Sequence, residues 1–407
     1  MGAMKAARAF AKRLLPLSAI KFIERYVDAL PDRVGKLLNP PKYADLPAGP
    51  ARPLLVGAGT ARLVVGPLNT AGQAYHWAHA VELRTEHAAL SLVVDSPDGF
   101  GFAAHRVVPQ LRADRSSDWQ RAEFRAIVSQ ATHVLIESAQ PLFGPLFGRD
   151  IERQTRALHN HGVRVAIVAH GSDVRDVEAH RAREPHSPYG DPQLVPEAAE
   201  LDASAACTRA AIARLGVPLF GSTPGVQFDL PTAVWLPVVV DPDGWAADFA
   251  PLDSAVPVVV HAPSRAGLKG SEVADDVLGR LHREGLIEYR RLDHASHSEV
   301  RVAYRAADIV VDSLRMGGYG VGACEAMAAG RLVLSHVNLH ARLAVEAVMG
   351  EQPPIWPADV GTLEVAVRAV LADREAARAL AARGPAFVRL AHDGRASATV
   401  LESFLGS

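Results

Sequence analysis

The stretch VVVHAPSRAGLKGSEVADDVLGRLHRE, residues 258–284, contains one complete strand, loop and helix. The apolar residues 258–261 are predicted to form a strand, and residues 271–284 have the pattern of a helix. The loop between them carries glycines and Lys269, the only lysine after Lys42. Such a unit is typical of an α/β sheet, in which ligands bind beyond the carboxyl ends of the strands.

The same alternation extends over most of the chain. In the first half we predict helices at 72–84 and 150–161 and strands at 62–65, 91–95, 133–137, 163–169, 203–207 and 233–236. After a break at 237–257, the predicted strands are 258–261, 287–292, 308–312 and 332–336. The helices predicted there are 271–284, 321–329 and one from the capping box Ser296–Glu299 to about residue 306.

This order predicts two Rossmann-like domains that face each other across a cleft, at 51–240 and 241–390, followed by a C-terminal helix at 391–407. The length of 407 residues is sufficient for two domains. A hydrophobic content of 49% and a charged content of 22% are typical of a soluble globular protein. The net charge of −2 gives no overall attraction to nucleic acid.

Cys207 and Cys324 are the only cysteines, which fits the reducing cytosol and supports neither a disulfide framework nor a cysteine-built metal site. No window approaches the roughly 18 uninterrupted apolar residues of a membrane span. Residues 1–50 are predicted to be a basic amphipathic arm with a Pro-rich connector. Residues 1–25 either bind the inner face of a membrane as an interfacial helix or pack on the protein.

Two loops of the second half carry groups suited to a nucleoside diphosphate. Arg265 and Lys269 lie beside a predicted helix N-terminus, where free N–H groups and the helix dipole attract an anion. In the loop 314–322, the backbone at Gly318, Tyr319 and Gly320 can approach a phosphate closely. Glu325, in the following helix, is predicted to accept hydrogen bonds from ribose hydroxyls. The alternatives are a solvated Lys269 and a Glu325 that serves only the helix dipole.

Two loops of the first half face the same cleft in this prediction. His170 and Asp173, in the stretch VAHGSD at 168–173, are the candidate catalytic residues. The imidazole would contact a sugar hydroxyl or the leaving group, and Asp173 would orient it or cap the next segment. Asn69, Gly72 and Gln73 are candidates for acceptor or cleft contacts, with Asn69 as a plain helix cap the alternative.

No metal site is predicted. The D-x-D spacing at Asp241–Asp243 follows a strand and starts the interdomain segment, so turn chemistry explains it better. The sequence also has no H-E-x-x-H, Walker lysine or G-x-S-x-G motif, so hydrolase and NTPase functions are not supported.

The second half resembles the donor-binding domain of the retaining GT-B-fold glycosyltransferases of the family-4 (glycosyl transferases group 1) type. The stretches HAPSRAGLKG (261–270), ASHSEVRVAYRAADIVVDS (295–313) and GGYGVGACEAMAAGRLVL (317–334) carry the resemblance. HGSD (170–173) and WLPVVVDPDGW (235–245) are similar to family stretches in the first half. The resemblance implies the GT-B fold, with a C-terminal helix that returns to the first domain.

The resemblance also implies transfer of a sugar from a nucleotide-diphosphate donor to a hydroxyl of a carbohydrate, lipid-linked or small-molecule acceptor. The transfer would retain the anomeric configuration and need neither a metal nor another cofactor. In such enzymes a basic pair, here Arg265 and Lys269, holds the diphosphate, and Glu325 corresponds to the second acid of the E-x7-E element. Gly317 stands at the place of the first acid, which ordinarily contacts the donor sugar.

Three alternatives remain open at this point. One is another GT-B enzyme, such as a nucleotide-sugar epimerase or a phosphorylase-like protein. Another is a nicotinamide-dependent enzyme that uses the G-x-G-x-x-A spacing at 318–323, although the acid expected after the next strand is absent. The third is a non-catalytic nucleotide-sugar-binding protein, because Gly317 replaces an acid.

Overall fold

The computed structural model describes residues 30–43, 57–95 and 101–406. The predicted membrane-binding residues 1–25 therefore lie outside the described part of the chain. Two short helices, α3 (Asp32–Leu38) and α4 (Pro40–Tyr43), precede the first sheet. The carbonyl of Lys42 accepts a hydrogen bond from Arg115 at 3.1 Å, so α4 is connected to the body of the protein.

The first sheet has seven parallel strands in the order β3-β2-β1-β4-β5-β6-β7. Their bounds are β1 Arg62–Gly66, β2 Ala88–Asp95, β3 Arg106–Pro109, β4 His133–Glu137, β5 Arg164–Ala169, β6 Leu219–Gly221 and β7 Val234–Trp235. The helices around it are η1 Thr70–Gly72, α5 Gln73–Arg84, α6 Gln110–Arg115, α7 Ser117–Gln130, η2 Gly144–Phe147, α8 Ile151–His159, α9 Val177–Arg183, η3 Pro188–Gly190, α10 Val195–Leu215 and η4 Pro224–Phe228. We call this unit the N-terminal domain.

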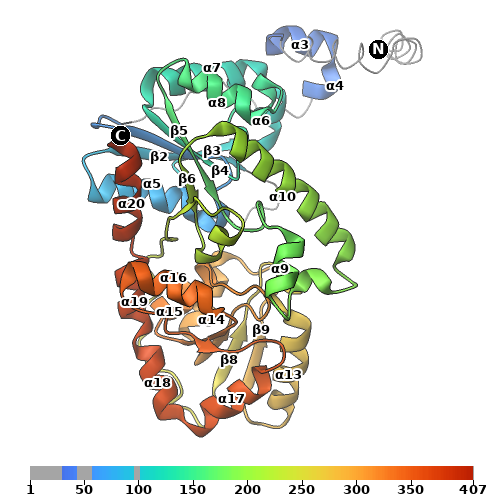
Figure 1. The fold of residues 1–407 in the computed structure, drawn as a ribbon, viewed down its shortest axis with the longest axis vertical. Helices are drawn as coiled ribbons and strands as arrows, with labels where there is room; N and C mark the ends of the chain where they lie inside the picture. Colours follow the sequence, from blue (N-terminus) through green and yellow to red (C-terminus); the bar gives the residue numbers. More distant parts are fainter. Residues whose placement is uncertain (1–29, 44–56, 96–100, 407) are drawn as a thin grey trace.

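The second sheet has five parallel strands in the order β12-β11-β10-β8-β9. The strands are β8 Val258–His261, β9 Glu288–Arg291, β10 Ile309–Val311, β11 Leu332–Ser335 and β12 Trp356–Pro357. The helices of this half are α11 Pro242–Trp245, α12 Ala266–Lys269, α13 Ser271–Arg283, α14 His297–Arg305, α15 Val321–Ala328, α16 Leu339–Met349, α17 Leu363–Ala372, α18 Arg374–Ala382 and α19 Gly384–Ala391. We call this unit the C-terminal domain; it forms the lower half of Figure 1.

Each face of the first sheet packs against its own layer of helices, because successive side chains of a strand point to opposite faces. Val64 and Val134 lie in one apolar cluster with residues of α7 and α8. Leu63 and Val65 lie in another cluster with residues of α5 and of the last helix, α20 (Arg395–Leu405). Helix α20 packs along α5, as Figure 1 shows, so the expected return of the C-terminal helix to the first domain is confirmed.

One predicted strand, at 203–207, is wrong. These residues lie inside α10, a helix of 21 residues. The segment is rich in alanine, the strongest helix former, and has no β-branched residue at 203–207 to favour a strand. Strands β3, β6 and β12 were not predicted; each has at most four residues, and β3 and β12 end in proline.

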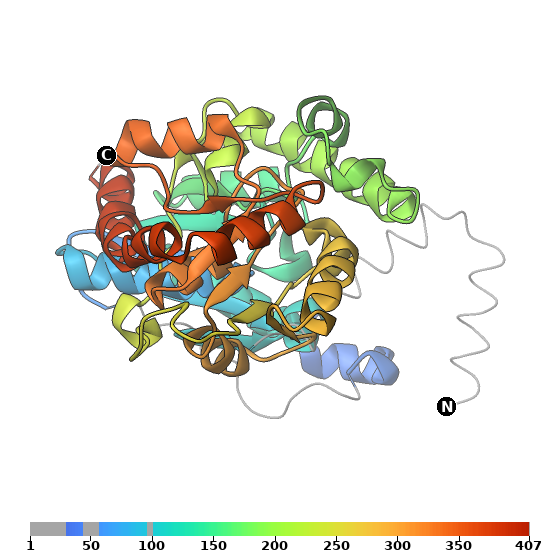
Figure 2. The same ribbon diagram turned by 90° about the horizontal axis from the view of Figure 1, so that it is seen from below.

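The chain passes between the domains at two places that lie side by side. Residues 236–241 lead into the C-terminal domain, and residues 392–394 lead back to α20. The N–H of Val240 donates to the carbonyl of His392 at 2.8 Å, and His392 Nδ1 donates to the carbonyl of Val238 at 2.8 Å. We call these two hydrogen-bonded segments the paired crossing. Figure 2 gives the view of both domains from below.

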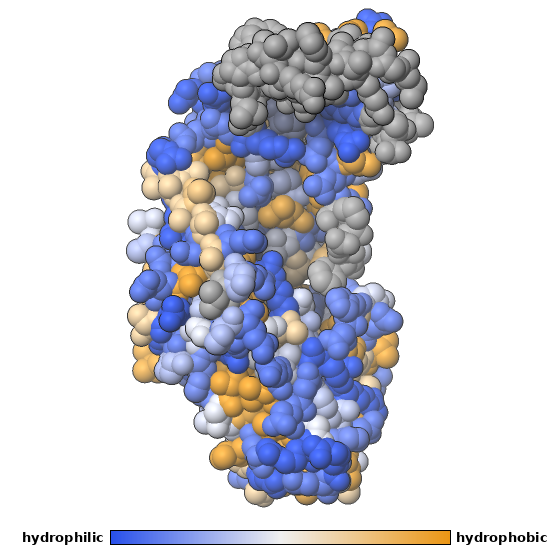
Figure 3. Space-filling view, turned by 90° about the vertical axis from the view of Figure 1, so that its right-hand side faces the viewer, coloured by the Kyte–Doolittle hydropathy of each residue, from blue (hydrophilic) through white to orange (hydrophobic). Residues whose placement is uncertain are grey.

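No helix within the described ranges combines the length and the apolar character needed to cross a bilayer. The face in Figure 3 is mainly hydrophilic, with hydrophobic residues in separate small groups.

Candidate functional site

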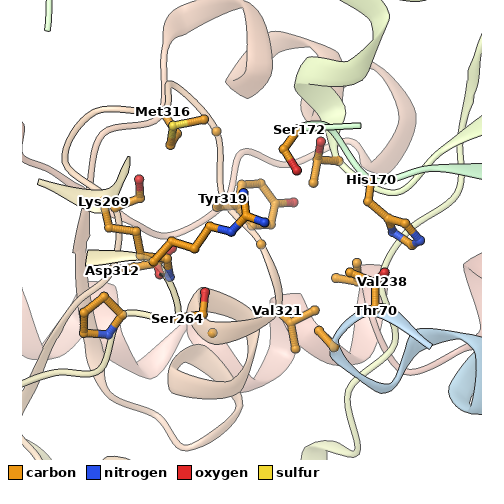
Figure 4. A pocket seen from close by; sticks show the side chains of 18 of the residues that line it. Thr70, His170, Ser172, Val238, Ser264, Lys269, Asp312, Met316, Tyr319 and Val321 are labelled. Atoms are coloured by element: carbon orange, nitrogen blue, oxygen red, sulfur yellow. Dashed lines mark hydrogen bonds and ion pairs between the residues drawn. The ribbon is translucent and has the colours of Figure 1, made fainter. Parts of the chain in front are cut away.

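A cavity of about 610 Å³ lies between the carboxyl ends of the two sheets. Loops that follow β1, β5 and β6 line it on one side, and loops that follow β8, β9 and β10 line it on the other. Figure 4 shows Lys269 and Asp312 on one side of this pocket and His170 and Thr70 on the opposite side. The cavity therefore brings together the loops that the sequence identified in both halves of the chain.

The order of strands in the second sheet explains where Lys269 lies. β8 and β10 are neighbours in the sheet. The chain leaves β8 toward β9 on one side and leaves β10 toward β11 on the other side, so a crevice opens between the loops that follow these two strands. Lys269 Nζ lies 2.6 Å from Asp312 Oδ1 across this crevice, with 23% of the lysine side chain and 4% of the aspartate side chain exposed. Asp312 thus fixes the position of the ammonium group at the edge of the cavity.

His261 fixes the loop that carries Lys269. Its Nδ1 donates to the carbonyl of Val311 at 2.8 Å, and the hydroxyl of Ser271 donates to Nε2 at 2.8 Å. Burial lowers the pKa of His261 to about 4, so the imidazole is neutral and has one donor and one acceptor nitrogen. The side chain is fully buried and ties the end of β8 to the start of α13.

Arg265 offers its side chain to the cavity, whereas Tyr319 offers its backbone. Arg265 is exposed, precedes α12 and lines the cavity. Tyr319 also lines the cavity, but its hydroxyl is buried and lies 3.2 Å from His392 Nε2. The tyrosine side chain is therefore part of the domain core, and its backbone, with Gly318 and Gly320, is what the loop offers to a ligand.

Gly317, where the resemblance leads one to expect an acid, lies against a carboxylate from the other domain. Its φ is +74°, and a Cβ at this position would stand 2.2 Å from Glu184 Oε1. Glu184 follows α9 of the N-terminal domain and accepts hydrogen bonds from His336 Nε2 at 2.7 Å and Asn338 Nδ2 at 2.6 Å. The Glu184 carboxylate fills the space that a side chain at 317 would need.

Glu325 lies on the same wall of the cavity, 6% exposed. Its Oε1 accepts a hydrogen bond from His297 Nε2 at 2.7 Å. Burial raises the pKa of Glu325, and the hydrogen bond from His297 acts in the opposite direction. The His297 ring also packs against two aromatic rings: its centre lies 5.0 Å from the centre of the Phe102 ring and 5.4 Å from that of the Trp245 ring. Residues of both domains therefore hold His297 in place.

His170 lies on the N-terminal side of the cavity, held at both ring nitrogens. Nε2 lies 3.2 Å from Glu137 Oε1, and Nδ1 lies 3.2 Å from Ser222 Oγ. Burial alone would lower the pKa of His170, but the carboxylates of Glu137 and Asp173 outweigh it, so the pKa is raised. The shift favours the imidazolium form of the ring over the neutral form.

Asp173 supports the loop rather than the imidazole ring. Its Oδ1 accepts hydrogen bonds from the backbone N–H of His170, at 3.0 Å, and of Gly171, at 2.7 Å. The carboxylate that contacts the ring is Glu137. Glu137 is fully buried and also accepts from the backbone N–H groups of the loop after β1, at Leu68, Asn69 and Thr70.

The loop 69–73 reaches the cavity mainly through Thr70 and Ala71. The side chain of Asn69 is buried and bonds within its own region, to Tyr75 N at 3.1 Å and Ala103 O at 3.0 Å. Gln73 lines the cavity, but its amide exchanges two hydrogen bonds with the backbone of Val239, at 2.6 and 3.1 Å. At Gly72, φ is +78° and a Cβ would lie 3.2 Å from the ring of Phe102.

Several functional candidates were missed by sequence reasoning. Asp312 and Glu137 end buried strands at the edge where ligands bind, and this position could have drawn attention to them. His297 begins the helix opened by the capping box, but its contact with Glu325 depends on packing. The others are Arg175, Arg183 and Glu184, which lie in or beside α9. Within the described ranges, no three His, Cys, Asp or Glu side chains are close enough together to hold a metal ion.

Comparison with solved structures identifies the architecture. The structure is similar to sucrose-phosphate synthase from Thermosynechococcus elongatus (TM-score 0.54, 14% identity, 84% of this chain and 97% of that chain). It is also similar to the catalytic domain of starch synthase IV from Arabidopsis thaliana bound to ADP and acarbose (TM-score 0.54, 10% identity, 84% of this chain and 98% of that chain). A third match is Anabaena HepE in complex with UDP (TM-score 0.51, 11% identity, 85% of this chain and 99% of that chain).

No protein-family model matches the sequence, and no curated protein matches it either. The likeness therefore concerns the fold, and it extends over most of the chain. This chain has two parallel sheets that face each other, a cavity between their carboxyl ends and a last helix that returns to the first domain. The chain has the GT-B fold.

Proposed function

We propose that the protein is a glycosyltransferase that moves a sugar from a nucleoside-diphosphate donor to an acceptor hydroxyl. The observation that carries the proposal is the Lys269–Asp312 pair at the crevice of the second sheet, with Glu325 on the same wall. The structures of HepE and of starch synthase IV hold UDP and ADP, which supports a nucleotide as the ligand of this cavity.

In the proposed complex the diphosphate lies against Lys269, Arg265 and the backbone of residues 318–320. Asp312 occupies one of the three donors of the ammonium group, which leaves the others for phosphate oxygens. These cations neutralise the charge that develops on the leaving diphosphate, and the proposed reaction uses no metal and no other cofactor. The carboxyl of Glu325, held by His297, accepts hydrogen bonds from the ribose hydroxyls.

The proposed transfer retains the configuration of the anomeric carbon. The bond from that carbon to the diphosphate oxygen breaks, and a bond to the acceptor oxygen forms on the same face. The acceptor proton passes to the departing phosphate oxygen, so the products are a glycoside and a nucleoside diphosphate. His170, with its raised pKa, lies on the opposite wall, where a positive charge would stabilise the departing oxygen.

We propose a cytoplasmic location, with residues 1–25 as a contact to the inner face of the membrane. If this arm binds a membrane, a lipid-linked acceptor is favoured over a soluble one. Deleting residues 1–25 should then release the protein from anionic vesicles in a sedimentation assay. Unchanged sedimentation with the vesicles would contradict a membrane role for the arm.

A thermal-shift titration with UDP, GDP, ADP and NAD tests the proposed function. One nucleoside diphosphate should stabilise the wild type and the exposed-surface control Lys36→Ala, but not Lys269→Ala. Stabilisation by NAD alone would favour a nicotinamide enzyme. Stabilisation by none, or of all three proteins equally, would contradict the assignment of the diphosphate to Lys269.

A product assay then separates transfer from epimerisation. The nucleotide sugar that matches the stabilising base is incubated with the enzyme, with and without acceptor candidates, and followed by NMR. A transferase releases the nucleoside diphosphate in an acceptor-dependent way. Conversion of the donor sugar without any acceptor would show an epimerase, and no reaction with any acceptor would leave a binding protein as the better description.

A further inference from the structure

The N-terminal wall of the cavity carries a second group of cations, separate from Lys269 and Arg265. Arg175 lies in the loop between β5 and α9, and Arg183 is the last residue of α9. Both line the cavity, together with the hydroxyl side chains of Ser172 and Thr223. Figure 4 shows Ser172 on the same side of the pocket as His170.

The guanidinium of Arg175 lies beside Gly171 and makes no hydrogen bond or close ion pair with any residue that the structure describes. A Cβ on Gly171 would stand 3.1 Å from Arg175 Nη2 and 3.8 Å from Thr223 Oγ1, so the glycine allows this close approach. Arg175 Nε is buried, and among the described residues it has no hydrogen-bond acceptor. The nearby Arg209, by contrast, donates to the carbonyl of Val174 at 2.9 Å and to Asp176 at 3.5 Å.

Arg183 is held in place by its surroundings. Its guanidinium lies 4.3 Å from the centre of the Phe228 ring and 3.7 Å from Asp229 Oδ2. Burial is the main reason why the pKa of Arg183 is lowered; Asp229 acts in the opposite direction, and the neighbouring Arg175 adds to the lowering. The two guanidinium groups thus lie in a partly buried region beside Asp229, whose side chain is fully buried.

Among the described residues, Arg175 is the unpaired member of this group: Asp229 lies within ion-pair distance of Arg183, and Asp176 and Glu184 also favour the charged form of Arg183. Buried donors without acceptors among the described residues, such as Arg175 Nε, cost free energy. An incoming anion with several oxygens would satisfy them, because a guanidinium offers paired N–H groups that match a phosphate or a carboxylate. The hydroxyls of Ser172 and Thr223 add further donors on the same wall.

We propose that Arg175 and Arg183 form a binding site for an anionic group, a phosphate or a carboxylate, on the acceptor substrate. The inference rests on the proposed function, which places the donor diphosphate on the C-terminal wall. The anion-binding site then holds the acceptor from the opposite wall and orients its hydroxyl toward the sugar. The acceptor class is accordingly a phosphorylated or acidic small molecule or lipid.

The test is a calorimetric titration with inorganic phosphate and, separately, with acetate. It is run on the full chain, with and without a saturating amount of the nucleoside diphosphate that stabilises the protein. Phosphate or acetate should bind in both conditions, because the site is separate from the donor site. Phosphate binding points to a phosphorylated acceptor, and acetate binding points to an acidic one.

Arg175→Gln should weaken this binding by about tenfold or more, while the nucleotide affinity stays unchanged. Arg181→Gln, which changes an exposed arginine on α9 two residues before Arg183, is the matched control and should bind like the wild type. Arg183→Lys keeps the charge beside Asp229 and should weaken the binding through loss of the planar guanidinium. Melting temperatures show that each variant is folded.

Three results would overturn the proposal: binding of neither anion, equal binding by wild type and Arg175→Gln, or anion binding that the nucleotide abolishes. The last result would mean that the anion occupies the diphosphate position. Failure of every nucleotide to bind would contradict the proposed transferase, but the titration without nucleotide would still report on Arg175 and Arg183. The two failures are therefore distinguishable.

Discussion

Single buried residues hold the loops of the candidate site in place. Glu137 contacts three backbone N–H groups of the loop after β1 and the imidazole of His170. His261 connects β8 to the start of α13. Neither residue needs to contact a ligand to influence the site, since each decides where a neighbouring loop lies.

We predict that Glu137→Gln lowers the pKa of His170. Burial alone disfavours the imidazolium, and the carboxylate of Glu137 is the main group that offsets it. Loss of an opposite charge at this distance should lower the pKa by about one unit or more. An NMR titration of the His170 ring measures the change; Asp118→Asn, an exposed carboxylate on α7, is the control and should leave it unaltered.

Buried neutral histidines should make the free energy of unfolding depend on pH. Burial lowers the pKa of His261 and of His392 to about 4, from the ordinary histidine value of 6.5. Between these values the unfolded chain binds protons that the folded protein does not bind, so stability is complete above pH 6.5 and decreases as the pH falls. From pH 7 to pH 5 each histidine should account for a loss of roughly 2 kcal/mol.

Urea unfolding at both pH values checks this expectation. His392→Asn removes one of these titrations, so its free energy of unfolding should change less between pH 7 and pH 5 than that of the wild type. An equal change in both proteins would mean that His392 is protonated in the folded state.

The helices and strands of the site could be predicted where local patterns determine them. β8 and the capping box of α14 lie as predicted. The strand predicted at 203–207 was wrong although the alanines of this segment favour a helix, because the prediction treated five residues apart from the 21-residue helix α10 that contains them. The contact of His297 with Glu325 depends on how α14 packs against α15, which no local pattern encodes.

The capping box of α14 provides a prediction at this scale. Ser296→Ala removes the side chain that accepts from the N–H of Glu299, which should cost about 1 kcal/mol of stability. Because His297 is the first residue of α14, fraying of this end should also weaken nucleotide binding through Glu325. Urea unfolding and the thermal-shift titration measure the two effects; Ser296→Asp, which retains a capping acceptor, should preserve both.

The side-chain contacts between the two domains could not be predicted from the sequence. Glu184 and its partners His336 and Asn338 belong to different domains and are far apart in the chain. Burial alone would raise the pKa of Glu184, but the hydrogen bonds from His336 and Asn338 outweigh it and the pKa is lowered. The two-domain plan followed from the order of strands and helices, whereas this interdomain contact follows only from their packing.

We predict that Glu184→Ala separates the domains on the side of α9. The variant loses both hydrogen bonds to the C-terminal domain, so small-angle scattering should show a larger radius of gyration than for the wild type. Nucleotide affinity should change little, because Lys269 and Glu325 lie within one domain. An unchanged radius of gyration would show that Glu184 does not keep the domains together.

Gly317→Ala examines the same interface from the C-terminal side. A methyl group at this position would collide with the Glu184 carboxylate and would also require a φ of +74° that alanine rarely adopts. We expect a loss of stability of about 1 kcal/mol or more and a radius of gyration that increases as in Glu184→Ala. Gly285→Ala shares the positive φ but has no neighbour near its Cβ, so it isolates the effect of the collision.

The paired crossing limits how the two domains of the protein can rearrange. A chain that passes once between two bodies leaves them free to twist, tilt and slide. Here two passages lie side by side and are hydrogen-bonded to each other at Val240 and His392. Two hydrogen-bonded connections favour a hinge motion about one axis over a twist of one domain against the other. Each closure of the domains should therefore bring the same two walls of the cavity to face each other.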